Sequence, residues 1–421
     1  MERFTLSRRA LSGAIIALGV VGFASAAFSA AKGDPIKIGV IIGLTGPNAV
    51  AGNDGLGAMQ LAVDEVNAAG GVMGRPLELI VEDNEGRPKA GVEAANKLAD
   101  VDQVPVVVGG YSSAIALPVG QVLNKKKVVW VTDATTNKLK TVGPYLFNTA
   151  GIAEQAVALV DFAKADAGAK TLAGLFQNNP IGQDRAAVSE KRAGEVGVEW
   201  THNMLYQVGA KDFRAELTKL LAAKPDAILT DIYDNDAQII QRQLYEMGVT
   251  DMSIFYSYNL SAFATLPPKF TVGMKGLSYA TAGARAAAFN EKFQEKFGRI
   301  YTDAWAPPFY DAVWIVATAM NLANSLDSTE IRNAMWPAAY RYSGVSGLGD
   351  KGFNRWGMQH GDQNAQAAFM DGKIQPYFVA GSSNNVLIFR YEDANGVPAT
   401  DGIPLAEAPS EEELKALYSG N

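Results

Sequence analysis

The sequence predicts an α/β protein made of two similar, doubly wound lobes, and three observations lead to this prediction. Strand-like and helix-like segments alternate along most of the chain. Strands such as Val104–Val108 are short apolar runs, as expected where helices cover both faces of a parallel sheet. The alternation restarts after Gly151, so we expect two sheets rather than one long one.

The first half of the chain contains four β/α units, which imply right-handed crossovers. Their strands are predicted at residues 36–44, 77–82, 104–108 and 127–131. A helix over 54–69 presents apolar side chains on one face at Leu56, Met59, Val63 and Val66. Gly70 and Gly71 mark its end, and Pro88 begins the next helix.

The second half repeats the pattern. Its strands are predicted at residues 171–176, 199–205, 226–232 and 252–256. Helices are predicted at residues 183–194, 212–222 and 236–247. A long helix over 304–322 carries Trp305 and Trp314, and the acidic tail from Ser410 is expected to form a short surface helix or a frayed end.

Residues 1–31 have the pattern of a signal peptide. Paired Arg8 and Arg9 precede a short apolar stretch over 14–23, and small residues with an Ala-x-Ala pattern follow at Ala24–Ala26. The Ser-Arg-Arg-x-Leu order is similar to a twin-arginine signal, which indicates export to a bacterial periplasm. The alternative is an N-terminal anchor helix, although the apolar stretch is short for a bilayer.

Composition excludes several classes of function. The chain has no cysteine, which excludes disulfides, thiolate metal sites and a cysteine nucleophile. The two histidines, His202 and His360, have no carboxylate or histidine at ligand-like spacing, and we interpret them as surface residues. A net charge of −7 argues against nucleic-acid binding. No phosphate-binding or nucleophile-elbow motif is present, so we expect no cofactor, metal or catalytic residue.

Specific runs of sequence resemble a known family. They are Ile36-Lys-Ile-Gly-Val40, Leu44-Thr-Gly-Pro47, Leu61–Gly71, Gly74-Arg-Pro76 and Glu82-Asp-Asn84. The chain thereby resembles the periplasmic leucine/isoleucine/valine-binding proteins of branched-chain amino-acid ABC importers, most strongly over residues 36–136. The resemblance implies a type I periplasmic binding protein, with two Rossmann-like lobes joined by a three-stranded hinge. Its first lobe would contain 36–148 plus 276–342, its second 149–275 plus 343–400, followed by a tail over 401–421.

The resemblance also implies ligand contacts in the first lobe. The serine-rich turn of the family matches Ser112 and Ser113, where hydroxyls and a helix N-terminus would hold a ligand carboxylate. The Ala-x-Thr of the family matches Ala134 and Thr136, a backbone carbonyl for an ammonium group and a hydroxyl for the carboxylate. Ser113 and Thr136 could instead simply cap helices, a role that is compatible with binding.

Three positions depart from the family's pattern. Ala51 stands where the family often has an aromatic wall, which leaves room for a bulkier ligand. The family's Tyr-Gly in the second lobe appears here as Ile181-Gly182. The acidic residue that often holds the ammonium group falls near Tyr258 and Asn259, neither of which is a carboxylate.

Other side chains of the second lobe could replace the missing contacts. Three aspartates near a strand end could bind an ammonium group: Asp231, Asp234 and Asp236. Four tyrosines could supply stacking and hydroxyl contacts: Tyr206, Tyr233, Tyr256 and Tyr258. Aromatic, extended or amide-type carboxylates therefore compete with leucine-like ligands in this prediction.

The function predicted from the sequence is capture of a small carboxylate-bearing ligand between the lobes, for an ABC importer. The partners would be that ligand and a membrane permease, and we expect a monomer. A ligand-sensing protein that feeds a receptor is the first alternative, because the same fold serves both roles. An exported enzyme is the second.

Overall fold

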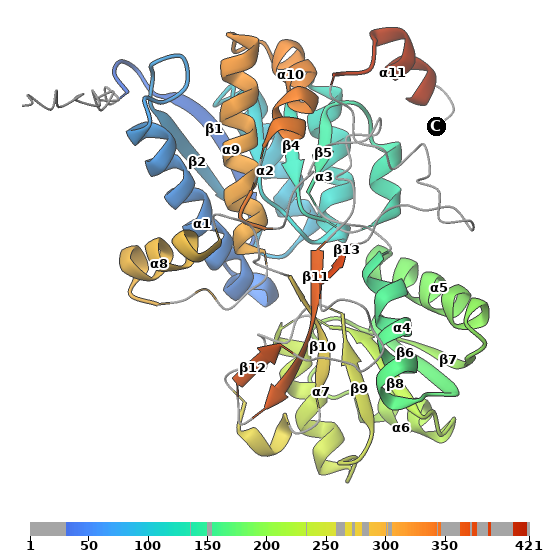
Figure 1. The fold of residues 1–421 in the computed structure, drawn as a ribbon. Helices are drawn as coiled ribbons and strands as arrows, with labels where there is room; N and C mark the ends of the chain where they lie inside the picture. The colour runs from blue at the N-terminus through green and yellow to red at the C-terminus, as the bar shows by residue number, and fades with distance from the viewer. Residues whose placement is uncertain are drawn as a thin grey trace, which may run out of the picture.

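The computed structural model shows two α/β lobes, one above the other in Figure 1. It describes residues 31–134, 136–149, 154–232, 234–257, 266–271, 274–279, 286–299, 301, 305–342, 344–346, 363–370, 373–376, 386–388 and 407–418. The predicted signal peptide and His360 lie outside the described residues.

The first lobe is built on a parallel sheet in the order β2-β1-β3-β4-β5. Its strands are β1 (Ile36–Ile42), β2 (Leu77–Asp83), β3 (Val106–Val108), β4 (Val129–Thr132) and β5 (Leu146–Asn148). The central strands β3 and β4 are buried along their whole length. This burial explains why their sequences are apolar without alternation.

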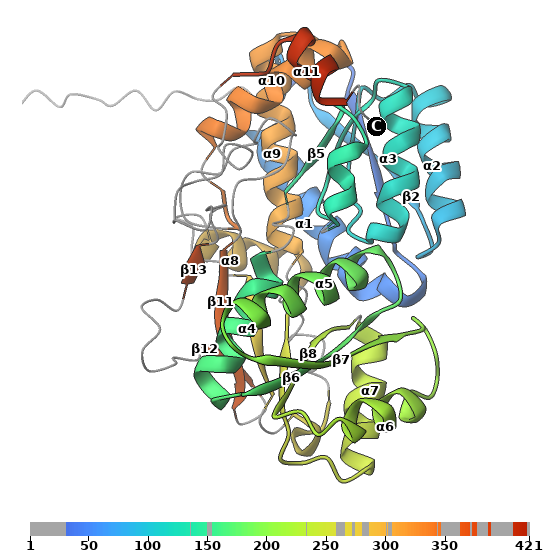
Figure 2. The same ribbon diagram turned by 90° about the vertical axis from the view of Figure 1, so that its right-hand side faces the viewer.

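Helices cover both faces of this sheet, as Figure 2 shows. One face is covered by α2 (Pro88–Asp100) and α3 (Ser113–Lys125). The other is covered by α1 (Ala49–Ala68), α9 (Ala306–Ala323) and α10 (Ser328–Arg341), with α8 (Ala286–Phe297) beside α1. The C-terminal helix α11 (Glu411–Tyr418) adds Leu414 to the same core, so the predicted tail helix packs on this lobe.

The second lobe has a sheet in the order β12-β11-β10-β9-β8-β6-β7, of which five strands are mutually parallel. The parallel strands are β6 (Thr171–Gln177), β7 (Glu199–Tyr206), β8 (Ala227–Asp231), β9 (Ser253–Tyr256) and β10 (Lys275–Tyr279). Antiparallel strands extend it: β11 (Gln363–Met370), β12 (Lys373–Pro376) and β13 (Val386–Ile388).

Two helix layers cover this second sheet. One layer contains α4 (Glu154–Ala167) and α5 (Pro180–Glu195), and the other contains α6 (Arg214–Ala222) and α7 (Asp234–Glu246). The two doubly wound α/β lobes predicted from the sequence are thus confirmed. The exposed strand position of His202 in β7 agrees with a surface role for that histidine.

The chain passes between the lobes three times: from β5 to α4, from β10 to α8, and from α10 to β11. The second passage corrects one predicted boundary. A division between residues 275 and 276 would cut β10, which pairs along its length with strands of the second sheet. The sequence misled here because the helix that follows β10, α8, packs against α1 of the first lobe and not on the sheet to which β10 belongs.

The third passage is held by a buried carboxylate on α9. Asp311 accepts hydrogen bonds from the backbone N–H groups of Val345 and Ser346, at 2.8 Å and 2.9 Å. It also accepts from the hydroxyls of Ser346 and Tyr342, at 2.6 Å and 2.7 Å. Gly344 leaves room for this contact, since a Cβ there would lie 2.3 Å from a carboxylate oxygen. Asp311 therefore fixes the start of the passage to the first lobe.

The first helix begins five residues earlier than predicted, at Ala49 instead of Asp54. Glycines near its start weakened the helix signal, because glycine has a low helix propensity. The structure shows why they are there. A Cβ at Gly52 would lie 1.8 Å from the carbonyl oxygen of Gly43, and one at Gly55 would lie 2.5 Å from the ring of Phe309. Close packing of α1 requires these glycines.

Candidate functional site

The lobes contact each other through elements that follow the carboxyl ends of parallel strands. The 3-10 helix η1 (Gly46–Asn48), after β1, contacts α7, which follows β8. Helix α3, after β3, contacts α5, which follows β6. Ligands of open α/β sheets bind beyond the carboxyl ends of the strands. The candidate site is therefore the region between the two sets of strand ends.

Ser112 and Ser113 lie where α3 begins, at this edge of the first lobe. Ser112 occupies the N-cap position, but its side chain makes no capping hydrogen bond. Ser113 is buried, and its Oγ has no hydrogen-bond partner within the described part of the chain. The first backbone N–H groups of a helix also lack intrahelical acceptors. The turn thus combines a buried hydroxyl with the positive end of a helix dipole.

Thr136 and Ala134 lie beyond the end of β4 and are fully buried. The Thr136 hydroxyl accepts a weak hydrogen bond of 3.4 Å from the Lys138 N–H, at the start of the 3-10 helix η2 (Asn137–Thr141). It donates to Asp184 of the second lobe across 2.6 Å. The carbonyl oxygen of Ala134 accepts from the Asn148 side chain at 2.7 Å and keeps a second lone pair. Thr136 is thus a cap and an interlobe contact together.

An aromatic pair lies near Ala51, which is itself buried in the first turn of α1. Tyr111 stacks on Trp305 with ring centroids 4.2 Å apart, and its hydroxyl donates to the Asn48 carbonyl at 2.9 Å. The sequence prediction did not include this pair. Tyr111 directly precedes the serine turn, which is a usable signal, whereas Trp305 comes from a distant segment that only the fold brings here.

In the second lobe, Ile181 is buried in the first turn of α5. The N-cap Asn179 accepts a hydrogen bond from the Gly182 N–H at 3.0 Å. A Cβ at Gly182 would lie 1.9 Å from the Gln177 carbonyl oxygen, so only glycine allows α5 to start this close to β6. Ile181 is thus held beside the end of β6, in a helix that begins three residues earlier than predicted, and its contact with a ligand stays a prediction.

The three aspartates that were predicted to bind an ammonium group either have other partners or lie outside the described residues. Asp231 forms a fully buried ion pair with Arg185, with 3.3 Å between Oδ2 and Nε, and accepts from Gln177 at 3.2 Å. Asp236 accepts from the Gly209 N–H; burial raises the pKa of its carboxyl, opposed by that hydrogen bond and by Lys211. The Asp234 side chain lies outside the described residues.

The tyrosine set is only partly described. Tyr206 and Tyr256 belong to the buried core of the second lobe: Tyr206 packs edge-on against Phe213, and the Tyr256 hydroxyl donates to Gln241 at 2.7 Å. Both rings therefore pack within the core of the second lobe. Tyr233, Tyr258 and Asn259 lie outside the described residues.

Asp83, at the end of β2, shapes the turn that leads to η1. Its carboxylate accepts from the N–H groups of Leu44 and Glu85, at 2.9 Å and 2.8 Å, and from the Thr45 hydroxyl at 2.6 Å. Partial burial by itself would raise the pKa of Asp83, but the hydrogen bonds from Thr45, Glu85 and Leu44 outweigh it and lower the pKa below the usual value. The charged form is therefore the one that the fold favours.

This shift predicts a pH-dependent effect of Asp83→Asn. A lowered pKa in the folded state adds stability above the unfolded-state value near 3.9, and that stability is lost as the pH falls through the lower folded-state value. We expect the variant to lose about 0.5–1 kcal/mol at pH 7, because the group is only partly buried, and less near pH 2.5. Urea unfolding at both pH values measures this. An equal loss of stability at both pH values would show that the shape of the Asp83 side chain, and not its charge, stabilises the fold.

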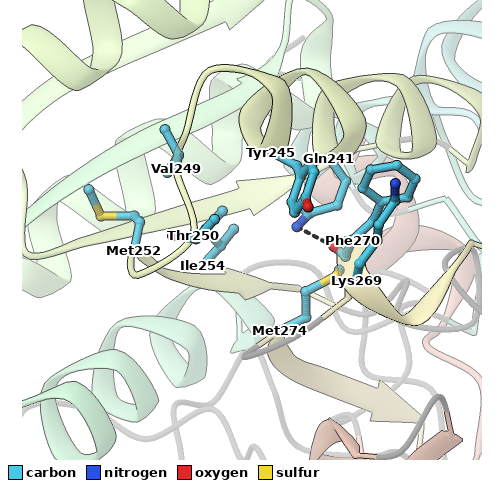
Figure 3. A pocket seen from close by; sticks show the side chains of 9 residues that line it. All are labelled: Gln241, Tyr245, Val249, Thr250, Met252, Ile254, Lys269, Phe270 and Met274. Carbon is cyan, nitrogen blue, oxygen red and sulfur yellow. Dashed lines mark hydrogen bonds between the residues drawn. The ribbon is translucent and has the colours of Figure 1, made fainter.

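A cavity of about 240 Å³ lies elsewhere in the second lobe; Figure 3 shows the side chains that line it. It is lined by Gln241, Tyr245, Val249, Thr250, Met252, Ile254, Lys269, Phe270 and Met274. Ile254 lies at the amino end of β9, and the Gln241 amide is already bonded to Phe270 and Tyr256. The cavity therefore lies away from the strand ends that meet the first lobe.

No group of three or more histidine or acidic side chains in the described part of the chain could hold a metal ion. Among the same residues, no helix is both long and apolar enough to span a bilayer.

Comparisons with known proteins agree with this architecture. The family model for periplasmic binding proteins matches residues 35–372. A leucine/isoleucine/valine-binding protein homologue of Brucella melitensis is 32% identical over 236 residues, 54% of this chain and 61% of the relative, so the match spans less than two thirds of that relative.

Solved structures share the fold. A branched-chain amino acid transporter substrate-binding protein of Streptococcus pneumoniae, in complex with isoleucine, superposes with a TM-score of 0.74 at 23% identity, covering 84% of this chain and 100% of its own. A solute-binding protein from Rhodopseudomonas palustris, in complex with 3,4-dihydroxybenzoic acid, gives 0.73 at 20% identity, with 82% and 97% covered. These findings confirm the resemblance seen in residues 36–136, and the chain belongs to the periplasmic binding protein family.

Proposed function

We propose that this protein is the periplasmic substrate-binding component of an ABC importer and captures a small carboxylate-bearing ligand between its lobes. Membership of the family supports solute binding. The names of similar proteins, which include an isoleucine complex and a dihydroxybenzoic acid complex, support a carboxylate as the shared ligand feature. Export by the twin-arginine route, directed by residues 1–31, and docking on a membrane permease belong to the same proposal.

The buried hydroxyl of Ser113 is the observation that carries the proposal. A buried hydroxyl without a partner is costly unless a bound group satisfies it. Ser113 Oγ lies at the start of α3, where the helix dipole and the first N–H groups favour an anion. A carboxylate there would satisfy the hydroxyl and gain the helix terminus as a second source of hydrogen bonds.

The proposed mechanism is closure rather than chemistry. A ligand held by the first lobe would gain contacts with the second lobe only when the lobes approach each other. Its differential affinity for the closed arrangement then shifts the population toward that state. The contact between Thr136 and Asp184 shows that groups of the two lobes reach hydrogen-bonding distance at this edge.

The test is a thermal-shift screen of the mature protein against amino acids, aromatic acids, amides and dicarboxylates, followed by calorimetry with the acids that bind. We expect Ser113→Ala to weaken binding by about 10–100-fold, since a hydrogen bond to a charged group contributes roughly 1.5–3 kcal/mol. Ser253→Ala, at the far end of β9, is the matched control and should bind as the wild type does. Unchanged affinity in Ser113→Ala would refute the carboxylate site.

A further inference from the structure

The cavity of the second lobe has a largely apolar wall. It lies between α7, the start of β9 and the 3-10 helix η4 (Pro268–Phe270), as the lining side chains in Figure 3 show. Ile254 and Met274 are buried members of the core of this lobe, and Met252 and Phe270 pack against that core. An apolar cavity of about 150 Å³ is large enough to hold benzene. A volume of about 240 Å³ therefore admits a six-membered ring with one substituent.

Two of the polar side chains that line the cavity already have partners. The Gln241 amide donates to the Phe270 carbonyl at 2.6 Å, and its oxygen accepts from the Tyr256 hydroxyl at 2.7 Å. The Thr250 hydroxyl donates to the Asp251 carboxylate at 3.0 Å. Neither Gln241 nor Thr250 therefore requires a ligand to complete its hydrogen bonds.

Lys269 and Tyr245 line the cavity with exposed side chains and so mark its mouth. Within the described part of the chain, no carboxylate pairs with Lys269 and the Tyr245 hydroxyl makes no hydrogen bond. The Lys269 ammonium lies 5.5 Å from the centroid of the Tyr245 ring and 4.9 Å from that of Phe270. These two rings pack edge-on, 5.1 Å apart, and attract the cation to this side of the mouth. A positive charge and a hydroxyl donor thus stand together beside an apolar cavity.

The charges at the mouth favour an anion on one side only. Asp251 is bonded to Thr250, which Figure 3 places apart from Lys269. A carboxylate beside Lys269 can accept from the ammonium and from the Tyr245 hydroxyl, and charge-assisted hydrogen bonds are the stronger kind. A ligand cation would instead face a like charge, and a neutral ligand would gain only the apolar wall.

We propose that this cavity is a second ligand site, which binds a compact monocarboxylate with an aromatic or alkyl body. The carboxylate contacts Lys269 and Tyr245, and the body packs against Ile254 and Met274. Because the cavity lies wholly within the second lobe, its ligand needs neither the serine turn of the first lobe nor contact between the lobes.

Two methionines that line the cavity, Met252 and Met274, report on its occupancy. Methyl signals of the mature protein labelled with [methyl-¹³C]methionine are followed by NMR during titration with benzoate at constant ionic strength. We expect both signals to shift, with a dissociation constant on the order of 1 mM for so small a ligand. Benzyl alcohol should bind about tenfold more weakly, and benzylamine should shift neither signal. Met252→Leu and Met274→Leu assign the two signals.

Three substitutions locate the binding. Lys269→Leu removes the charge and should weaken benzoate about tenfold while leaving benzyl alcohol unchanged. Lys219→Leu is the matched control, because Lys219 is exposed on α6 of the same lobe and lies away from the cavity lining; it should change neither affinity. Ser113→Ala, which alters the carboxylate site between the lobes, should leave the benzoate shifts of Met252 and Met274 as they are in the wild type.

The possible results separate the second site from the proposed function. If benzoate shifts neither Met252 nor Met274, or if benzylamine shifts them as much, the second site is wrong. If the shifts are lost in Ser113→Ala, benzoate acts from the region between the lobes, so the second site is wrong and the proposed function stands. Shifts that persist in Ser113→Ala and weaken in Lys269→Leu support the second site whatever binds between the lobes. The comparison of the three probes on the wild type does not depend on the folding of any variant.

Discussion

Asp231→Ala is expected to lower the free energy of unfolding by about 3–5 kcal/mol, because it removes a buried carboxylate that is paired with a buried guanidinium. Arg185 and Asp231 each expose only 1% of their side chains, and their atoms lie 3.3 Å apart. The pair also engages Gln177, so the substitution removes an acceptor from a second buried group. Urea denaturation monitored by circular dichroism measures the loss.

A matched ion pair in the same lobe serves as the control. Arg192 and Asp161 join α5 to α4 through two hydrogen bonds of 2.8 Å and 2.9 Å, but their side chains are 30% and 42% exposed. Asp161→Ala should therefore cost about 0.5–1 kcal/mol, since water screens the pair. A similar loss in both variants would mean that burial does not set the strength of these pairs. The double variant Arg185→Met with Asp231→Leu should recover most of the stability.

Asp311→Ala is expected to cost about 3–4 kcal/mol. The substitution removes the acceptor of four donors, among them the buried N–H groups of Val345 and Ser346, and the loss of a buried acceptor costs roughly 1–3 kcal/mol for each such group. Relaxation of the backbone should limit the total. Because the same groups fix the third passage between the lobes, we also expect faster proteolysis near residues 342–346. Chemical denaturation and limited proteolysis measure the two effects.

Asp327→Ala provides the comparison for Asp311. Asp327 caps α10, accepting from the N–H groups of Thr329 and Glu330 at 2.8 Å and 3.0 Å, but it is exposed. Loss of an exposed cap costs about 1 kcal/mol. We expect that loss with no change in proteolysis near residues 342–346. If Asp327→Ala increased proteolysis near residues 342–346 as much as Asp311→Ala does, global destabilisation would explain the cleavage, and loss of the Asp311 hydrogen bonds would not.

The sequence was sufficient to predict the two lobes because parallel strands and amphipathic helices each leave a strong local pattern. An apolar run such as Val106–Val108 predicts a buried strand without any information about the strands that pair with it. The antiparallel extension, β11 to β13, was not predicted, since its pairing with β10 depends on a chain that returns from the other lobe. The early start of α1 was also missed, because Gly52 looks unfavourable until its contact with Gly43 is known.

The candidate site was predictable where a residue follows a strand within a few positions. Ser113 and Thr136 are of this kind, because the carboxyl ends of β3 and β4 place them at one edge. Asp184 and Trp305 could not be found in this way. Asp184 lies within a helix of the other lobe, and Trp305 approaches Tyr111 from nearly two hundred residues away. No local sequence pattern indicates that either residue lies near Thr136 or Tyr111.

The packing of α9 on α1 has a consequence for synthesis on the ribosome. Tyr310 on α9 donates to Glu65 on α1, and Arg299, just before α9, pairs with Asp54, both across 245 positions of sequence. The first lobe therefore cannot complete its core until α9 and α10 have left the exit tunnel, and Leu414 of α11 joins that core later still. The parallel strands of the second lobe, β6 to β10, are all made before then. The nascent chain thus carries an unfinished first lobe for most of translation, with apolar surface of that lobe exposed until α9 and α10 emerge.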